Sequence, residues 1–249
     1  DKNNFEIALY FFMGAAIFHF NPKAKKDRFL EVFLFEPQTA KEKERGGLYI
    51  IGELTNALPI NASFLRQLAL VIKNEYYITR RTVKRKPSPQ TALKAALKKA
   101  NLYLVAESKK GNIDWLGNLN VSVLSFLAVS PTKYQFYFTK TGKIEMLMGR
   151  DNTFLDIGEK VESSKEKDAL KVFTNVVSGK LEENDRVVVV TNELNETFAK
   201  SDMLSPIAKF AEEKEFHKFF KGKEKETSKV TGAMFVALID EPEEEKEKE

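Results

Sequence analysis

Few side chains in this 249-residue chain have the chemistry of a nucleophile or of a soft metal ligand. The chain has no cysteine, which excludes disulfides, thiolate nucleophiles and zinc–cysteine sites. Neither histidine has a catalytic motif around it: His19 lies in the apolar run Ile17–Phe20, which indicates a structural position or an edge strand, and His217 lies among charged residues, where we expect it to be solvated. Any chemistry must therefore come from carboxylates, amides, hydroxyls and basic side chains.

The densest group of positive charge is a short basic segment near residue 83. Its basic residues are Arg80, Arg81, Lys84, Arg85 and Lys86. Such a group can hold the phosphates of nucleic acid or of an anionic lipid surface. No aromatic side chain is interleaved with it, so a solvated loop between two helices is the preferred interpretation. We expect at most weak, salt-sensitive contact with polyanions or a membrane surface, and no specific nucleic acid.

Hydrophobic periodicity predicts the elements that would position these groups. Strand-like runs with period two come first, with a charged stretch expected to be a loop at Gln38–Arg45; the runs are Glu6–Phe12, Ala15–Phe20, Phe29–Phe35 and Leu48–Ile51. The period then changes to 3.6 in two amphipathic helices. These are predicted at about Asn61–Tyr77, with Asn61 as N-cap, and at Pro89–Glu107, with Ser88 as N-cap.

The second half of the chain predicts an antiparallel meander, a buried strand, a helical region and a closing strand. Their ranges are Val121–Val129, Tyr134–Phe138, Ile144–Met148, Phe154–Ile157, Arg186–Val190, Glu193–Phe220 and Ala233–Ile239. This order predicts an α+β fold: a four-layer α-β-β-α sandwich of two antiparallel sheets flanked by helix pairs. We expect a single domain over residues 1–240 and an acidic, disordered tail or linker over residues 241–249.

The apolar run near the start of the sequence bears on the location of the chain. The apolar run Phe5–Phe20 contains Glu6, Gly14 and His19, and it is shorter than a membrane-spanning helix requires. It has neither the basic start nor the small-residue cleavage site of a signal peptide. We therefore expect no transmembrane segment in this chain and a cytoplasmic location.

Several of these stretches, in this order, resemble the metal-dependent protein phosphatases of type 2C, the PPM family. The stretch Leu116–Val121 after the second helix resembles the family's turn into a core strand, and Tyr134–Met148 resembles its next hairpin. Leu181–Leu194 resembles its "polar–Gly–Asp, apolar strand, Ser-Asp-Gly-Leu" segment, and Val230–Val236 resembles its closing "Asp-Asn-x-Thr" strand. The resemblance implies an α-β-β-α sandwich in which aspartates at strand ends hold two Mg or Mn ions that activate a bridging water for attack on phosphate.

The positions that resemble this metal site carry few acids. The family's Ser-Asp-Gly corresponds to Thr191-Asn192-Glu193, its closing Asp-Asn to Thr231-Gly232, its Gly-Asp-Ser-Arg turn to Phe138-Thr139-Lys140, and its early Asp-Gly to Ile51-Gly52-Glu53. Glu53 alone remains as a ligand, because a one-residue shift on a strand would turn Glu193 elsewhere. The residual site positions are Glu53, Lys140, Asn192, Glu193, Thr231 and Gly232, and we expect no catalytic residue and no metal cofactor.

Three functions remain open on these observations. The leading hypothesis is a catalytically inactive phosphatase-like domain that acts in protein interaction, regulation or scaffolding with an unknown protein partner. The first alternative is an active metal-dependent serine/threonine phosphatase, with Mg or Mn, whose rearranged site uses Glu53 and Glu193. The second is a module that binds nucleic acid or a membrane surface through the basic segment Arg80–Lys86.

Overall fold

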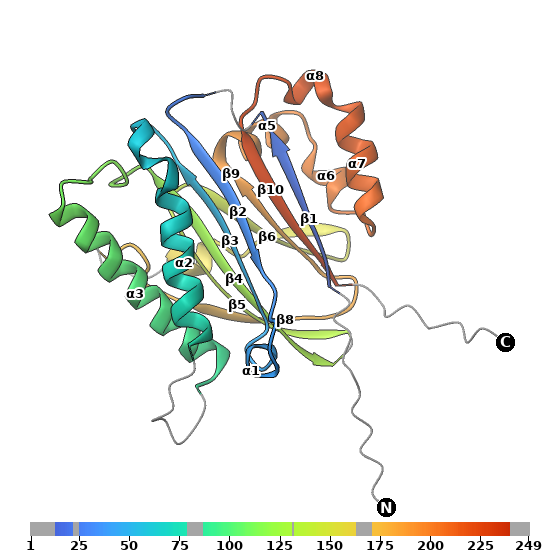
Figure 1. Cartoon of the computed structure of the whole chain (residues 1–249). Helices are drawn as coiled ribbons and strands as arrows, with labels where there is room; N and C mark the ends of the chain where they lie inside the picture. Colours follow the sequence, from blue (N-terminus) through green and yellow to red (C-terminus); the bar gives the residue numbers. More distant parts are fainter. Residues whose placement is uncertain (1–12, 22–24, 79–86, 131, 163–170, 240–249) are drawn as a thin grey trace, which may run out of the picture.

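The computed structural model describes residues 13–21, 25–78, 87–130, 132–162 and 171–239. Within these residues, two five-stranded antiparallel sheets are stacked face to face between two layers of helices (Figure 1). This is the predicted four-layer α-β-β-α sandwich. No helix among the described residues combines the length and the hydropathy needed to cross a membrane.

Each sheet brings together strands from distant parts of the chain. The β1 sheet has the order β1-β10-β9-β6-β7, with strands Met13–Phe20, Gly232–Ile239, Arg186–Thr191, Ile144–Arg150 and Thr153–Asp156. The β2 sheet has the order β2-β3-β4-β5-β8, with strands Phe29–Phe35, Gly47–Leu54, Leu119–Ser130, Lys133–Thr141 and Val177–Leu181. Every pairing is antiparallel, so the start of one strand lies beside the end of its neighbour.

The helices form the two outer layers (Figure 1). The long helices α2, Phe64–Tyr77, and α3, Pro89–Lys109, cover the outer face of the β2 sheet. The outer face of the β1 sheet is covered by α5, Asn192–Lys200, α6, Leu204–Ile207, and α7, Glu213–Gly222, and the short α8, Glu224–Thr227, contacts α5. The short helices α1, Ala40–Lys43, and α4, Glu159–Glu162, and a 3-10 turn, Pro59–Ser63, lie in connections.

The core consists of three apolar clusters, one at each junction between layers. One lies between α2, α3 and the β2 sheet, one between the two sheets, and one between the β1 sheet and the helices α5, α6 and α7. The strands β3, β9 and β10 are therefore buried on both faces along their whole length. This explains why their sequences are nearly continuous apolar runs with little alternation.

Most of the predicted elements on described residues are confirmed, including the N-cap of α3, whereas the strand predicted at Glu6–Phe12 and the tail predicted at residues 241–249 lie outside the described residues. Ser88 Oγ accepts a hydrogen bond from the Thr91 backbone N–H at 3.2 Å, and Pro89 occupies the first helical position. His19 lies on the edge strand β1 with its side chain exposed, and His217 is exposed on α7, where its Nε2 lies 3.1 Å from Glu213. Both histidines thus have the structural positions expected of them.

Several local predictions are wrong. Asn61 does not cap α2, which begins at Phe64, because Asn61 lies in the preceding 3-10 turn and donates its amide to Asp114 at 2.7 Å. The stretch predicted as a loop at Gln38–Arg45 contains α1, which a Thr39–Glu42 capping box stabilises. The strand β8 was not predicted, because Val177–Leu181 includes a glycine and a lysine.

Candidate functional site

One end of the layer between the two sheets is polar, whereas the rest of that layer is apolar. The ends of β3, β5 and β9 and the starts of β4 and β10 meet there, at the upper end of the sandwich in Figure 1. We call this cluster the polar end; its residues are Arg28, Glu53, Asn120, Lys140, Thr191, Glu193 and Thr231. Four of the positions predicted from the family resemblance, Glu53, Lys140, Glu193 and Thr231, lie in it.

Arg28 is the residue that joins the two carboxylates of the polar end. It directly precedes β2, and its side chain is only 13% exposed. One guanidinium nitrogen lies 2.6 Å from Glu193 Oε2, and Nε lies 3.4 Å from Glu53 Oε1. The same nitrogen that contacts Glu193 also donates to the Thr231 carbonyl at 3.0 Å. One cation therefore links β3, α5 and the start of β10.

Glu53 is a buried carboxylate with an incomplete set of partners. It is 1% exposed, and its Oε2 accepts a hydrogen bond from Asn120 Nδ2 at 3.2 Å. Its Oε1 accepts no hydrogen bond from the described residues, although Arg28 is nearby. Burial raises the pKa of Glu53, against the opposing effects of the Arg28 charge and the Asn120 hydrogen bond. The ionised form of Glu53 is therefore less favourable in the folded protein than in water.

Glu193 has the opposite electrostatic setting. Burial tends to raise its pKa, but hydrogen bonds from Lys25, at 2.7 Å, from Arg28 and from the Thr231 backbone N–H together lower the pKa below its ordinary value. The expectation that Glu193 would point away from the site is wrong. That expectation assumed a strand, but Glu193 lies in the first turn of α5, where the alternation of strand side chains does not apply.

The remaining predicted positions differ in how they relate to the two carboxylates. Asn192 is the first residue of α5 and donates its amide to Glu196 Oε1 at 2.9 Å, one turn along the helix. Gly232 has no room for a side chain, because a Cβ there would lie 2.4 Å from Thr191 Oγ1. Thr231 is buried, and its hydroxyl makes no hydrogen bond with the described residues.

Lys140 is buried at the end of β5 and is held by the β5–β6 hairpin. Its Nζ donates to the Ile144 carbonyl at 3.0 Å and lies 3.9 Å from Glu145 Oε2. Asn120 connects this hairpin to Glu53, because its Oδ1 accepts a hydrogen bond from the Lys143 backbone N–H at 2.7 Å. The polar end is therefore one connected set of interactions that spans both sheets.

Sequence reasoning missed Lys25, Arg28 and Asn120. Asn120 lies inside β4 directly opposite Glu53. The signal available for the other two was a short charged run, Lys25-Lys26-Asp27-Arg28, immediately before a strand. A charged run before a strand is ordinarily a solvated turn, so the pattern alone does not reveal that Arg28 points inward.

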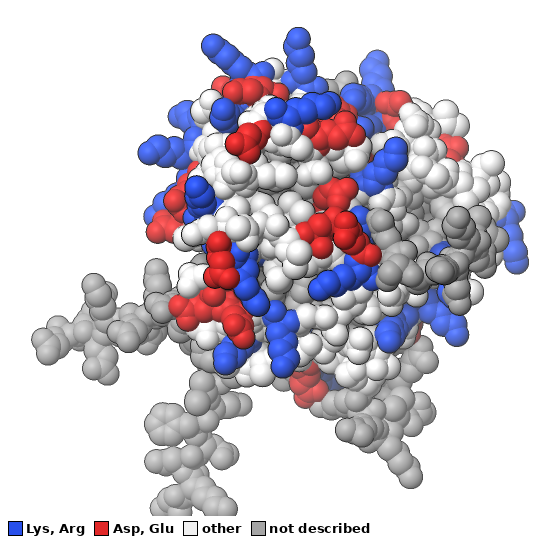
Figure 2. Space-filling model, turned by 180° about the vertical axis from the view of Figure 1, so that it is seen from behind, with Lys and Arg blue, Asp and Glu red and all other residues white. Residues whose placement is uncertain are grey.

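The basic segment from Arg80 to Lys86 lies outside the described residues, so its proposed contact with polyanions stays a prediction. Figure 2 shows the face opposite to that of Figure 1, and on it basic and acidic side chains are interspersed. This mixed charge on the described surface gives no support for a large polyanion-binding patch on that face.

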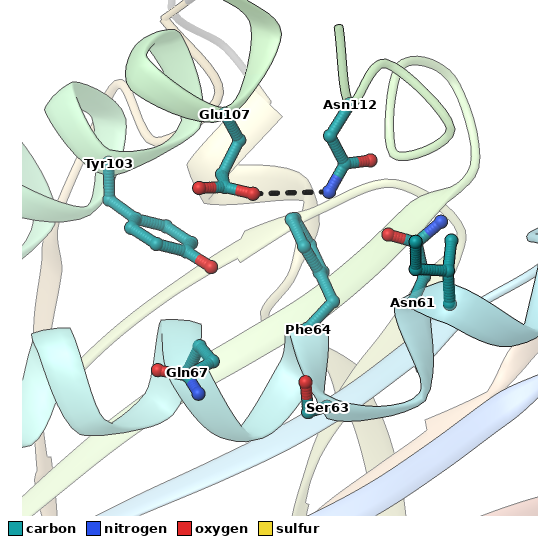
Figure 3. A pocket seen from close by; sticks show the side chains of 8 residues that line it. Asn61, Ser63, Phe64, Gln67, Tyr103, Glu107 and Asn112 are labelled. Carbon is teal, nitrogen blue, oxygen red and sulfur yellow. Dashed lines mark hydrogen bonds between the residues drawn. The ribbon is translucent and has the colours of Figure 1, made fainter. Parts of the chain in front are cut away.

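A separate hollow of about 240 Å³ lies between the start of α2 and the end of α3 (Figure 3). Its wall includes Phe64, Gln67, Tyr103, Glu107 and Asn112. Glu107 accepts hydrogen bonds from Asn112 at 3.2 Å and from Lys110 at 2.7 Å, so its carboxylate is already paired. This hollow has none of the positions predicted from the family resemblance.

Comparison with known proteins places this geometry in context. No protein-family model matches the chain, and no curated protein matches it significantly. Solved structures do match over almost the whole chain. The S. agalactiae serine/threonine phosphatase is 10% identical with a TM-score of 0.59, and the alignment covers 92% of this chain and 100% of that one.

Two further solved structures give the same result. The catalytic domain of the serine/threonine phosphatase PstP, solved in complex with two manganese ions, is 10% identical with a TM-score of 0.57 and coverages of 92% and 98%. PppA, described as a key regulatory component of T6SS in Pseudomonas aeruginosa, is 9% identical with a TM-score of 0.56 and coverages of 91% and 97%. Identities this low establish the fold alone, and on that basis this chain has the fold of the type 2C metal-dependent protein phosphatases.

Proposed function

We propose that this chain is a catalytically inactive phosphatase-like domain that acts through protein interaction, in a regulatory or scaffolding role. The observation that carries the proposal is the pairing of Glu53 and Glu193 with Arg28. The two carboxylates that would have to bind metal are instead paired with basic side chains of the same protein, Arg28 being shared by both.

The charges of the polar end do not suit a pair of divalent cations. Its two carboxylates, Glu53 and Glu193, contribute two negative charges, and Arg28 together with the neighbouring Lys25 contributes two positive charges. The remaining cation, Lys140, lies 3.9 Å from Glu145, so the acids and bases are already balanced. Two dications would add four positive charges, and among the described residues the polar end has no further carboxylate to offset them. Hard cations such as Mg²⁺ and Mn²⁺ rely on carboxylate oxygens. The residues present therefore do not fit a two-metal hydrolytic centre.

The backbone near Gly232 supports the same conclusion. The family resemblance aligns Thr231-Gly232 with a closing Asp-Asn, yet a Cβ at Gly232 would overlap Thr191 Oγ1 and lie 2.9 Å from Leu194 Cβ. An added side chain would require β9 and α5 to move. The packing around Gly232 leaves no room for a side chain, which is consistent with the loss of a metal ligand at this position.

A regulatory role has support from one structural neighbour and from the fold. PppA is described as a regulatory component of a secretion system, although the shared fold does not by itself transfer that role. A domain that has the fold but lacks the charges needed for catalysis would act through its surface. We place this role in the cytoplasm.

The decisive experiment is a phosphatase assay on the whole chain. We expect no hydrolysis of p-nitrophenyl phosphate or of phosphopeptides above background with added Mn²⁺ or Mg²⁺, and no tight metal binding by calorimetry. PstP catalytic domain, assayed in parallel, is the positive control. Metal-dependent turnover that is lost in Glu53→Ala or Glu193→Ala would overturn the proposal.

One observation favours the alternative of an active phosphatase with a divergent site. The structure brings Glu53 and Glu193 onto the same guanidinium, and their environments shift their pKa values in opposite directions. Pairs of carboxyl groups with such divergent pKa values are typical of acid–base sites. The assay above distinguishes the two functions, because only an active site would lose turnover when either glutamate is replaced.

A further inference from the structure

We propose that Arg28 is a built-in counter-ion that blocks a latent divalent-cation site, so that removing this one side chain lets the polar end bind a metal ion. The inference deepens the proposed inactivity by naming the residue responsible for it. It concerns the chain's own ion pairs and does not require that the wild-type protein bind any metal.

The geometry shows a cation placed where oxygen atoms converge. The Arg28 guanidinium contacts Glu193 Oε2 at 2.6 Å, the Thr231 carbonyl at 3.0 Å and Glu53 Oε1 at 3.4 Å. These are carboxylate and carbonyl oxygens, the donors that hard divalent cations prefer. A guanidinium can satisfy them because it is planar, always charged and carries several N–H donors.

Two buried oxygen atoms indicate that this arrangement is not saturated. Glu53 Oε1 and Thr231 Oγ1 make no hydrogen bond with the described residues, although both side chains are about 1% exposed. Buried polar atoms are ordinarily paired, so unpaired oxygens beside a cation mark unused coordinating capacity. Glu53 lies beside Arg28, and Thr231 accepts a hydrogen bond from Arg28 through its carbonyl.

Lys25 is a weaker obstacle than Arg28. Its ammonium contacts Glu193 at 2.7 Å, but its side chain is 44% exposed, compared with 13% for Arg28. An exposed ion pair contributes little and is screened by salt. Without Arg28, the amide of Asn120 would be the remaining partner of the buried Glu53 carboxylate among the described residues, and a divalent ion would offset that buried charge.

The test compares the thermal unfolding of wild type and Arg28→Ala with and without MnCl₂ or CaCl₂, each added alone. We expect Arg28→Ala to unfold at a lower temperature than wild type without metal, and millimolar Mn²⁺ to raise its midpoint by about 3 °C or more. The wild-type midpoint should change by less than about 1 °C. The matched control is Arg66→Ala, which removes an arginine paired with Glu31 at 3.6 Å on the surface; it should behave as wild type.

A second variant keeps the inference testable if Arg28→Ala does not fold without metal. In Arg28→Ala/Glu53→Gln the buried carboxylate is neutral, so this protein should fold without metal and lose the Mn²⁺ response. Refolding yields of Arg28→Ala with and without Mn²⁺ then provide the same comparison. No metal response in Arg28→Ala, or an equal response in wild type, would overturn the inference.

The outcomes separate this inference from the proposed function. If the wild-type chain is inactive and Mn²⁺ does not raise the unfolding midpoint of Arg28→Ala, the blocking role of Arg28 is refuted and the proposed function is unaffected. A wild-type chain with metal-dependent turnover would refute the proposed function directly, whatever the variant does.

Discussion

The Arg28 guanidinium lies 2.6 Å from the Glu193 carboxylate, although the two residues are 165 positions apart in the chain. Arg28 directly precedes strand β2 of the β2 sheet, and Glu193 lies in the first turn of α5, which covers the β1 sheet. This ion pair therefore ties the two halves of the sandwich together at the end where the type 2C fold has its strand termini. Its energetic consequences can be tested by stability measurements that do not depend on enzymatic activity.

The two glutamates of the polar end should affect the pH dependence of stability in opposite ways. The pKa of Glu193 is lowered in the folded state, so its ionised form stabilises the fold above the ordinary glutamate pKa of 4.5, and this contribution is lost as the pH falls through the folded pKa. Glu193→Gln should thus lower the free energy of unfolding by about 1–2 kcal/mol at neutral pH and have little effect in acid.

Glu53 has a raised pKa, so the sign is reversed. The folded state holds this proton more tightly than the unfolded state, and stability falls as the pH rises from 4.5 through the folded pKa. Glu53→Gln should therefore remove that fall and be as stable as wild type, or more stable by about 1 kcal/mol, at neutral pH. Urea unfolding of both variants from acid to neutral pH measures the two trends, and parallel trends would contradict the assignment.

Gly232 should resist any side chain. Gly232→Ala would place a Cβ 2.4 Å from Thr191 Oγ1, and we expect a loss of about 2 kcal/mol in the free energy of unfolding. Gly179→Ala is the matched control, because a Cβ there would meet only Phe136, at an ordinary 3.7 Å. Urea denaturation should show a much larger loss of stability in Gly232→Ala than in Gly179→Ala. Equal losses would show that β9 and α5 can move to accommodate the added side chain.

The helices α2 and α3 should differ in their dependence on the serine that precedes them. Ser88 accepts a hydrogen bond from the Thr91 N–H, whereas Ser63 makes no side-chain cap at α2. Ser88→Ala should therefore lower stability by about 1 kcal/mol, and Ser63→Ala by less than about 0.5 kcal/mol. Thermal unfolding of the pair checks this order, and the reverse order would refute the assigned caps.

Asp185 should be a strong stability determinant at the opposite end of β9. It is 2% exposed and receives Arg150 Nε at 2.8 Å and the Glu182 backbone N–H at 2.7 Å. Asp185→Asn should cost about 2–3 kcal/mol, because hydrogen bonds to a buried charge are lost or weakened. Glu196→Gln, on an exposed pair 4.0 Å from Lys200, should change stability by less than about 0.5 kcal/mol. Similar losses in both variants, measured by urea unfolding, would contradict this difference.

Local features of the chain were readable because their causes are local. The apolar runs of β3, β9 and β10 and the 3.6 period of α2 and α3 predicted the order of elements, and with it the sandwich. Ser88 before Pro89 predicted the start of α3 correctly, since capping depends on residues within one turn. Glu53 was also predicted as a residual site position, because Ile51-Gly52-Glu53 resembles the family's early Asp-Gly; it lies one residue before the end of β3.

The partners of these residues were decided only by the tertiary structure. The sequence by itself determined that acids are scarce at the positions resembling the metal site, but not that Arg28 would stand between the two that remain. Strand alternation misplaced Glu193, because β9 ends at Thr191 and a helix begins at the next residue. Local sequence patterns indicate which face of an element is apolar. The partner of a charged side chain depends instead on how the two sheets stack, and this stacking brings Glu53 and Glu193 to the guanidinium of Arg28.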